Sequence, residues 1–505
     1  NLNNNAGSIT SIINARGGTM GSIANNANGS IDNLNNQAGG TITALNNNVN
    51  GTVTTFANAG SITNGTNAGT ITTFNNNRGG NVNNFTNNAG GNIATLNNTG
   101  GTFTTLTNNA TIQNAINSGI MQTITNNSQI NSFNNQTGGR VTTLQNTNTG
   151  SITNVSNTGT ITTLTNENTI TTLSNNTNGT ITTLNNNSTI STLTNAANAN
   201  IGTLNNNGTV TNNFANQGTI DALNNQANGS LVRITNSATG RINTLTNEGN
   251  MTGGITNQRG GTIGTITNRT VLTGWIVNHG NITTGIINEN NGSIDFVLNN
   301  NTMGNIINRN GSTITAISNN AIAGNAQNMG TLTNESGGRV DSLNNFGNMA
   351  GVANSGTLDN ATNSGTITDF SNNAGGSVTT LQNNQGGTIN TLTNQSTLST
   401  IENAGTIVNG TNNGTITNFN NNQNTGIVEN FTNSNQINTF NNNGGEVQNL
   451  TNAQGGTIAD FTNATQGRVD TLTNAGTLSN LNNQTNGTMN TLTNTGSITD
   501  GQNSG

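Results

Sequence analysis

Apolar and polar residues recur along this chain in one short unit. From Gly159 the sequence reads GTITTLTNE, NTITTLSNNTN, GTITTLNNN, STISTLTNAAN and ANIGTLNNN, and the same unit begins at Gly7, Gly365 and Gly487. Its general form is G-[TS]-I-T-x-L-x-N-x, in copies of nine or eleven residues, a period typical of β-solenoids. With the Gly as position one, the Ile lies at position three, the Leu at six and the Asn at eight.

The spacing of these positions predicts strands. From the Leu through the Asn to the next Gly and Ile, most steps are even, so all four side chains share one face of a strand. The longer copies add two residues after the Asn and keep this parity, whereas a helical period would be lost. The step from Ile to Leu is odd, which predicts a bend between them. A second bend is expected between the Asn and the next Gly, since Asn and Gly adopt positive φ.

Short strands joined by regular bends predict an all-β fold, one continuous β-solenoid over residues 1–505. Roughly fifty units at two per coil make about twenty-five coils, and three units per coil is the alternative. Positions three and six fill the core, and the inward Asn at position eight forms a hydrogen-bonded ladder between coils. The expected core residues are Ile161, Leu164, Ile170, Leu173, Ile181 and Leu184. The expected ladder residues are Asn157, Asn166, Asn175, Asn186, Asn195 and Asn206.

One stretch, residues 249–328, departs from the regular unit. Its copies GNMTGGITN, TVLTGWIVNH and GNITTGIIN each hold one extra residue between the first apolar position and the Asn. The single Trp, Trp275, and the single His, His279, both lie here. One interpretation is a binding patch or branch point. The other is a bulged stretch in which the Trp packs against a wider bend.

Composition favours a thin core over several globular domains. Hydrophobic residues make up 28% and charged residues 5% of the 505 residues, against about 45–50% and ~25% in globular domains. Asn-rich chains of this kind are often disordered, but disorder does not require Ile, Leu and Asn at fixed parity. Pro is absent, as suits a chain that forms β-ladders almost throughout.

The same composition argues against several functions. There is no Cys and no Lys, the net charge is −6, and no basic stripe or long apolar run occurs, so nucleic acid and a membrane span are not expected. With one His and scattered acids we expect no catalytic residues, no metal, no cofactor and no enzymatic activity. Many charged residues fall at outward positions, where pairs such as Arg339 and Asp341 attract each other weakly.

Thr flanks the inward Ile in many units and forms outward T-x-T ranks. Examples are Thr160 with Thr162, and Thr180 with Thr182. Such ranks are similar to the ice-binding face of solenoid antifreeze proteins. The array is interrupted by other residues at position four, and Thr is also an ordinary exposed strand residue. Ice binding is therefore the alternative function.

The unit Gly-Thr-Ile-x-x-Leu-x-Asn resembles the repeats of large bacterial autotransporter passenger domains, including vacuolating-toxin-like ones, and of other surface adhesins. The resemblance implies a right-handed β-solenoid that is extracellular or displayed on the bacterial cell surface as a stalk, adhesin, sheath or fibre. The expected function is therefore structural or adhesive. A polysaccharide-processing enzyme would need a groove with clustered acids, which the sequence does not indicate.

The expected partners are further repeats of the same polypeptide, other copies of the chain in end-to-end or lateral filament contacts, and surface glycans. The chain opens mid-unit at Leu2 and Asn4 and closes with Gly505, which begins another unit. Because uncapped rungs offer unpaired backbone groups, we expect either a longer parent polypeptide or end-to-end stacking into a filament.

Overall fold

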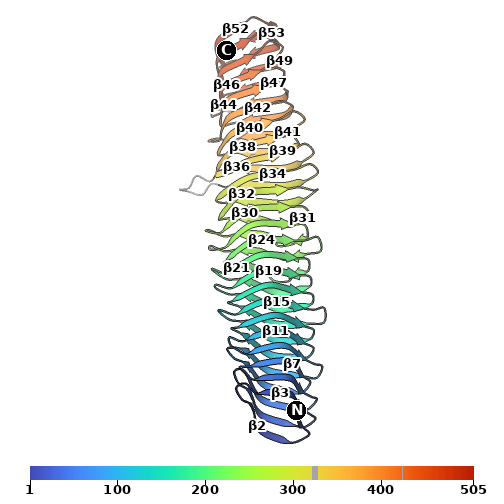
Figure 1. Ribbon diagram of the computed structural model, residues 1–505. Helices are drawn as coiled ribbons and strands as arrows, with labels where there is room; N and C mark the ends of the chain where they lie inside the picture. Colours follow the sequence, from blue (N-terminus) through green and yellow to red (C-terminus); the bar gives the residue numbers. More distant parts are fainter. Residues whose placement is uncertain (321–327, 423–424) are drawn as a thin grey trace. The chain divides into compact units, whose positions relative to one another are not determined.

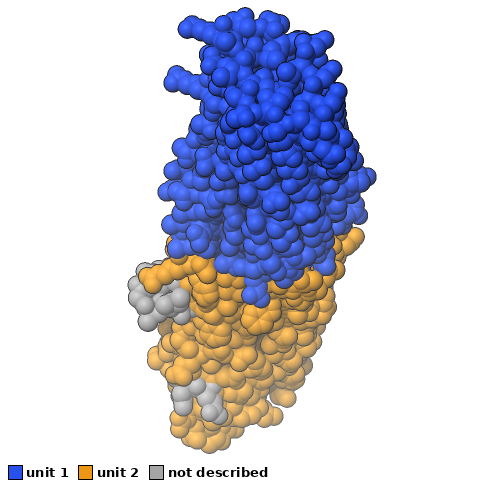
Figure 2. Space-filling view, turned by 90° about the horizontal axis from the view of Figure 1, so that it is seen from below, with its two compact units in different colours: residues 1–251 blue, residues 252–505 orange. Residues whose placement is uncertain are grey.

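The computed structural model describes residues 1–320, 328–422 and 425–505. They form two compact units, Asn1–Met251 and Thr252–Gly505, coloured separately in Figure 2. Each unit is a parallel β-solenoid, and the described residues contain no helix (Figure 1). The described strands make about 25 turns, with two sheets and about 20 residues per turn. The predicted all-β solenoid is confirmed, and each turn contains two units rather than three.

Consecutive strands alternate between the two sheets of a unit. In the first unit β15 (Arg140–Asn146), β17 (Thr160–Asn166) and β19 (Thr180–Asn186) are neighbours in one sheet. In the other sheet β16 (Ser151–Asn157), β18 (Thr169–Asn175) and β20 (Thr189–Asn195) are neighbours. Like positions therefore stack on like positions, as Ile161 does on Ile181.

Each regular strand runs from position two to position eight of a unit and bends in its middle. In β17 the side chains of Ile161, Leu164 and Asn166 are buried, whereas Thr162 is exposed and Thr163 half-buried. Thr162 at position four has no partner in the strand ladder, although the residues on both sides do. The ladder interruption marks the bend that lets positions three and six both point inward.

The core is a thin layer of stacked apolar columns. The six predicted core residues all have 0% exposure: Ile161, Leu164, Ile170, Leu173, Ile181 and Leu184. Larger rings stack in the same columns, with the centroids of Phe56 and Phe74 4.3 Å apart. Where Phe85 needs more space, its neighbour in the column is Gly65, whose missing Cβ would lie 2.5 Å from the Phe85 ring.

The turns after position eight contain the expected left-handed residues. In a long turn Asn178 has a φ of 66°, and the N–H of Gly179 donates to the carbonyl of Asn176 at 2.7 Å. A Cβ on Gly179 would lie 2.3 Å from the carbonyl oxygen of Asn157 in the preceding coil. Gly is therefore favoured at this position by the close approach of the neighbouring backbone.

Extra residues produce local irregularities in the sheets. In the second unit β31 (Val271–Asn278) and β32 (Asn281–Asn288) are eight residues long, and their pairings shift register at the extra residue. The first unit has a similar insertion that the sequence analysis did not identify, where the strand breaks between β22 (Thr209–Val210) and β23 (Phe214–Asn216). Of the predicted irregular stretch, residues 321–327 lie outside the described residues.

The assignment of core and outer positions predicts opposite outcomes for neighbouring substitutions. Leu164→Lys places a charge in the thin core, and we expect a loss of several kcal/mol of stability with local opening of the coil. Thr163→Lys, on the half-buried outer side of the bend, should change stability little. Limited proteolysis with a protease that does not cleave at Lys measures the difference. Equal protease sensitivity of the two variants would refute the assignment.

Candidate functional site

Two columns of inward Asn side chains form the most regular polar feature of the molecule. Asn146 donates its Nδ2 to Oδ1 of Asn166 at 2.9 Å, and Asn166 donates in turn to Asn186 at 2.9 Å. Asn186 continues this column to Asn206, while Asn157, Asn175 and Asn195 belong to the column of the other sheet. All six predicted ladder residues have 0% exposure. The predicted Asn ladder is thus present as two parallel ladders.

Each ladder Asn also binds backbone carbonyls that the turns direct inward. Asn166 Nδ2 lies 3.1 Å from the carbonyl oxygen of Asn168 and 2.9 Å from that of Thr189. In the longer turn, Asn175 Nδ2 lies 3.2 Å from the carbonyl oxygen of Gly179 and 2.9 Å from that of Asn200. After a turn of either length, the ladder Asn therefore binds two equivalent carbonyls. One belongs to position one at the end of its own turn, and the other to position two in the following coil.

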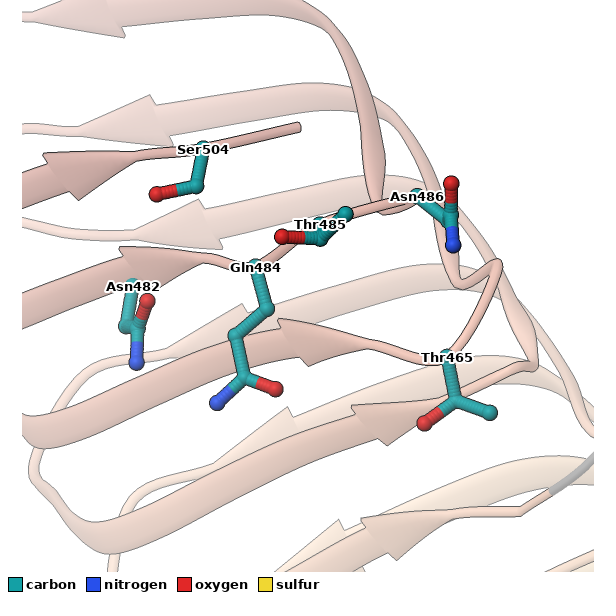
Figure 3. Close-up of a pocket in the computed structure, with 6 residues that line it drawn as sticks. All are labelled: Thr465, Asn482, Gln484, Thr485, Asn486 and Ser504. Carbon is teal, nitrogen blue, oxygen red and sulfur yellow. The ribbon is translucent and has the colours of Figure 1, made fainter.

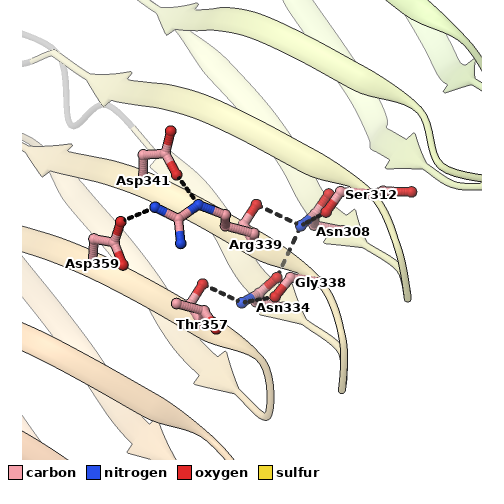
Figure 4. A network of polar contacts seen from close by, with 8 residues as sticks. All are labelled: Asn308, Ser312, Asn334, Gly338, Arg339, Asp341, Thr357 and Asp359. Atoms are coloured by element: carbon pink, nitrogen blue, oxygen red, sulfur yellow. Dashed lines mark hydrogen bonds and ion pairs between the residues drawn. The ribbon is translucent and has the colours of Figure 1, made fainter.

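The same arrangement occurs in the second unit, where Figure 4 shows one example. Asn308 Nδ2 donates to Oδ1 of Asn334 at 2.9 Å and to the carbonyl oxygens of Ser312 and Arg339, each at 3.0 Å. Asn334 binds the carbonyls of Gly338 and Thr357 in the same way. One side chain thus links its own turn to the following coil.

The ladders run without a break inside each unit. In the first unit one column extends from Asn4 to Asn247 and the other from Asn14 to Asn236, with amide-to-amide distances of 2.7–2.9 Å. Every amide between the ends of these columns therefore has an amide partner in the coil before it and in the coil after it, in keeping with the rule that buried polar groups are hydrogen-bonded.

Trp275 lies on the outside of β31 rather than in the core. Its side chain is 57% exposed, and its ring meets that of Phe296 at a centroid distance of 5.0 Å and an interplanar angle of 63°. Phe296 belongs to β33 (Ser293–Asn299), the next strand of the same sheet. The adjacent Ile276 has 0% exposure. The extra residue of this unit is thus accommodated as a bulge that leaves Trp275 facing outward.

His279 lies in the turn after β31, four residues beyond Trp275. Its Nδ1 is 3.2 Å from Asn300 Nδ2, and Asn320 Nδ2 donates to Asn300 Oδ1 at 3.0 Å. A row of polar side chains therefore continues along the turns of three successive coils beside the outward aromatic pair.

Charged side chains form short chains of ion pairs on outer positions. Arg339 pairs with Asp341 at 2.6 Å, as predicted, and also with Asp359 of the next coil (Figure 4). In another turn column Glu289 lies between Arg269 at 2.8 Å and Arg309 at 2.5 Å. These opposite charges alternate along the coils, so each pair links neighbouring rungs at the surface.

The T-x-T ranks are divided between two sheets and interrupted within each. Thr160 pairs in register with Thr180, but the coils on either side present Arg140 and Asn200 at position two. Position four also lies at the bend. The hydroxyl array is therefore short and bent.

A shallow hollow of about 470 Å³ lies on the turn side of the second unit (Figure 3). Its lining side chains are polar and uncharged, and none is a strong nucleophile, acid or base. They are Thr465, Asn482, Gln484, Thr485, Asn486 and Ser504. This lining offers hydrogen bonds but no group suited to acid–base or nucleophilic chemistry.

Within the described part of the chain, no group of three or more His, Asp or Glu side chains is placed to hold a metal ion. No helix among the same residues has the length and apolarity to cross a membrane. The chain matches no protein-family model and no curated protein.

The outward position seven was not singled out from the sequence. It is occupied by Val277, Ile287, Leu298 and Ile307 in four consecutive units, between Thr267 and Ser318 in the flanking ones. All four side chains are half-buried on the outer face. Tabulating this one position along the repeat would have revealed the change.

The ladders predict that position eight is far less tolerant than position seven. Asn166→Leu leaves the amide of Asn146, Oδ1 of Asn186 and the carbonyl of Thr189 short of a partner, at about 1–3 kcal/mol for each group that stays unsatisfied. The carbonyl of Asn168 keeps the N–H of Thr189 at 2.8 Å. The control Asn185→Leu removes one half-buried bond from Asn205, at a net cost of about 1 kcal/mol or less. Thermal unfolding of the two variants provides the comparison. Interchangeable behaviour of the two positions would be inconsistent with an internal ladder.

The outward position of Trp275 predicts a second contrast. Ile276→Ala empties a buried site and should lower stability by about 2–5 kcal/mol. Trp275→Ala removes a side chain that is more than half exposed and should cost much less. Thermal unfolding followed by circular dichroism tests both variants. A larger loss for Trp275→Ala would show that the Trp packs into the core.

Proposed function

We propose that this chain is a structural or adhesive protein of a bacterial surface, acting outside the cell as part of a stalk, sheath or fibre. The observation that supports this role is the unbroken pair of Asn ladders within each unit, which repeats one stabilising arrangement in every coil. In repeat proteins, stability is approximately a sum of local terms and nearest-neighbour interfaces. Such a chain gains length without needing a larger core, which suits a protein that spans distance.

The side chains available for chemistry support the same proposal. None of the described acids is buried. Several are engaged in ion pairs or amide contacts, as with Glu402, which accepts from Asn420 and Asn422. The absence of Lys and the low charge reduce cleavage by trypsin-like proteases and repulsion between stacked rungs. Other copies of the chain, or further repeats of the same polypeptide, are the partners that this role requires.

The location is tested by immunogold labelling of the bacterium that produces the chain. Antibodies against the purified chain should label intact cells, with gold along projections or a surface layer. Labelling that appears only after permeabilisation would contradict the proposal. A deletion strain is the matched control for antibody specificity.

An ice-recrystallisation assay on the purified chain distinguishes the alternative function. We expect no inhibition, because the Thr array is short and bent. Inhibition that disappears in Thr162→Lys and persists in Asp32→Lys, a change at the same position on another coil, would favour ice binding over the structural role. A polysaccharide-degradation assay on the same sample tests the expectation that the chain is not an enzyme.

A further inference from the structure

A compact apolar patch lies on the outer face of one sheet in the second unit. Positions five and seven of β31 and β33 point outward, and Trp275 pairs with Phe296 and Val277 with Leu298 in register. Elsewhere in the described strands position seven is mostly Asn, Thr or Ser. The large aliphatic exceptions are Ile13 and Ile116, which are isolated, and Ile287 with Ile307, which pair on the other sheet without an aromatic neighbour at position five. We call these four side chains the platform: Trp275, Val277, Phe296 and Leu298.

The platform has a polar border along one edge. Strand alternation continues from Trp275 and Val277 to His279, and from Phe296 and Leu298 to Asn300. His279 and Asn300 are in hydrogen-bond contact at 3.2 Å, and Asn320 extends the row at 3.0 Å. The contacts hold these side chains in a line, with further donors and acceptors of the amides and the imidazole available to a ligand.

The apolar platform and its polar border together indicate the chemistry of the ligand. Exposed apolar patches rimmed by polar residues mark binding sites, and Trp is among the residues that contribute most to binding at interfaces. The platform and its border carry no carboxylate and no guanidinium, so nothing in them selects a charged ligand. A partner must therefore offer an apolar face beside a row of hydroxyl or amide groups. A pyranose ring has this form, with C–H bonds on its face and hydroxyls at its rim.

The size of the patch argues against a protein partner. A stable protein interface involves about 20–30 residues a side and buries about 800 Å² per partner. Four platform side chains, three of them already half-buried, supply much less apolar area than that. The patch instead matches a ligand that covers two successive coils, which lie about 4.8 Å apart.

We propose that the platform and its polar border bind a neutral saccharide chain, with a sugar ring against Trp275 and its hydroxyls bonded to His279 and Asn300. This site extends the adhesive role proposed above but does not depend on it, because a stalk without a saccharide site remains a stalk. Failure of saccharide binding and failure of surface labelling are therefore separate results.

Intrinsic fluorescence gives a direct test because Trp275 is the only Trp and the chain has no Tyr. The full chain is titrated with cellohexaose, maltohexaose and N-acetylchitohexaose at up to millimolar concentrations. We expect a blue shift of the Trp emission and reduced quenching by acrylamide with at least one of these sugars. Unchanged emission and unchanged quenching with all three would overturn the proposal.

Variants that retain Trp275, whose fluorescence reports binding, show where the sugar binds. Leu298→Thr restores the residue type common at position seven, and Phe296→Ser introduces a residue that occurs at position five of other units, for example at Ser342. Each should weaken binding roughly tenfold, the loss expected for removal of one apolar or aromatic contact. Ile287→Thr makes the matched change on the other sheet and should leave the affinity unchanged. Equal weakening by Ile287→Thr would place binding elsewhere.

Sedimentation of the same samples without sugar tests whether a second copy of the chain covers the platform instead. A monomer whose emission is independent of protein concentration is expected. Reversible self-association that blue-shifts the Trp emission, and is abolished by Leu298→Thr, would assign the platform to a second copy of the chain and overturn the saccharide proposal.

Discussion

The interaction on which this structure depends is the hydrogen bonding of the inward Asn at position eight, because it pairs polar groups inside a narrow solenoid. Each coil reverses direction twice, and at each reversal backbone carbonyls point toward the interior. The two N–H groups of a carboxamide are shared among these carbonyls and the oxygen of the next amide, and its own oxygen accepts from the amide of the preceding coil. Asp would add a buried charge, and the longer Gln would misplace the donors. The persistence of Asn at this position follows from that geometry.

The tolerance of the repeat elsewhere follows from the same ladder. Asn166 and Asn175 bind the equivalent carbonyls although one precedes a short turn and the other a longer one, so residues can be added after position eight without moving the amide. An extra residue inside a strand is absorbed differently, as a bulge at Trp275 that keeps Ile276 and Asn278 inward. Insertions therefore change the outer surface and leave the interior intact, which allows surface sites such as the Trp275 platform to arise on a constant interior.

Parity in the sequence was sufficient to predict the inward positions, because a strand has a fixed period of two and the apolar residues fit one face only with a bend. It did not decide between two and three units per coil, since Ile161 lies on the core face in either closure. Its pairing with Ile181 rather than another Ile depends on how the turns close in space. The sequence also located the irregular stretch around Trp275. It did not decide whether the Trp275 side chain faces the core or the solvent, because one extra residue moves each side chain before the bulge to the opposite face of the strand. The insertion before Phe214 is hard to recognise in the sequence, because Val210 and Phe214 still have the apolar character of positions three and six.

Hydrogen exchange of the Asn side-chain amides is the most direct test of the ladder. In the ¹⁵N-Asn-labelled chain, NMR distinguishes Nδ2 protons that exchange with solvent quickly from those that are protected. The account predicts strong protection for position-eight residues such as Asn166 and Asn175, and fast exchange for exposed turn residues such as Asn178. Exchange of Asn166 and Asn175 at the rate of Asn178 would contradict an internal hydrogen-bonded ladder.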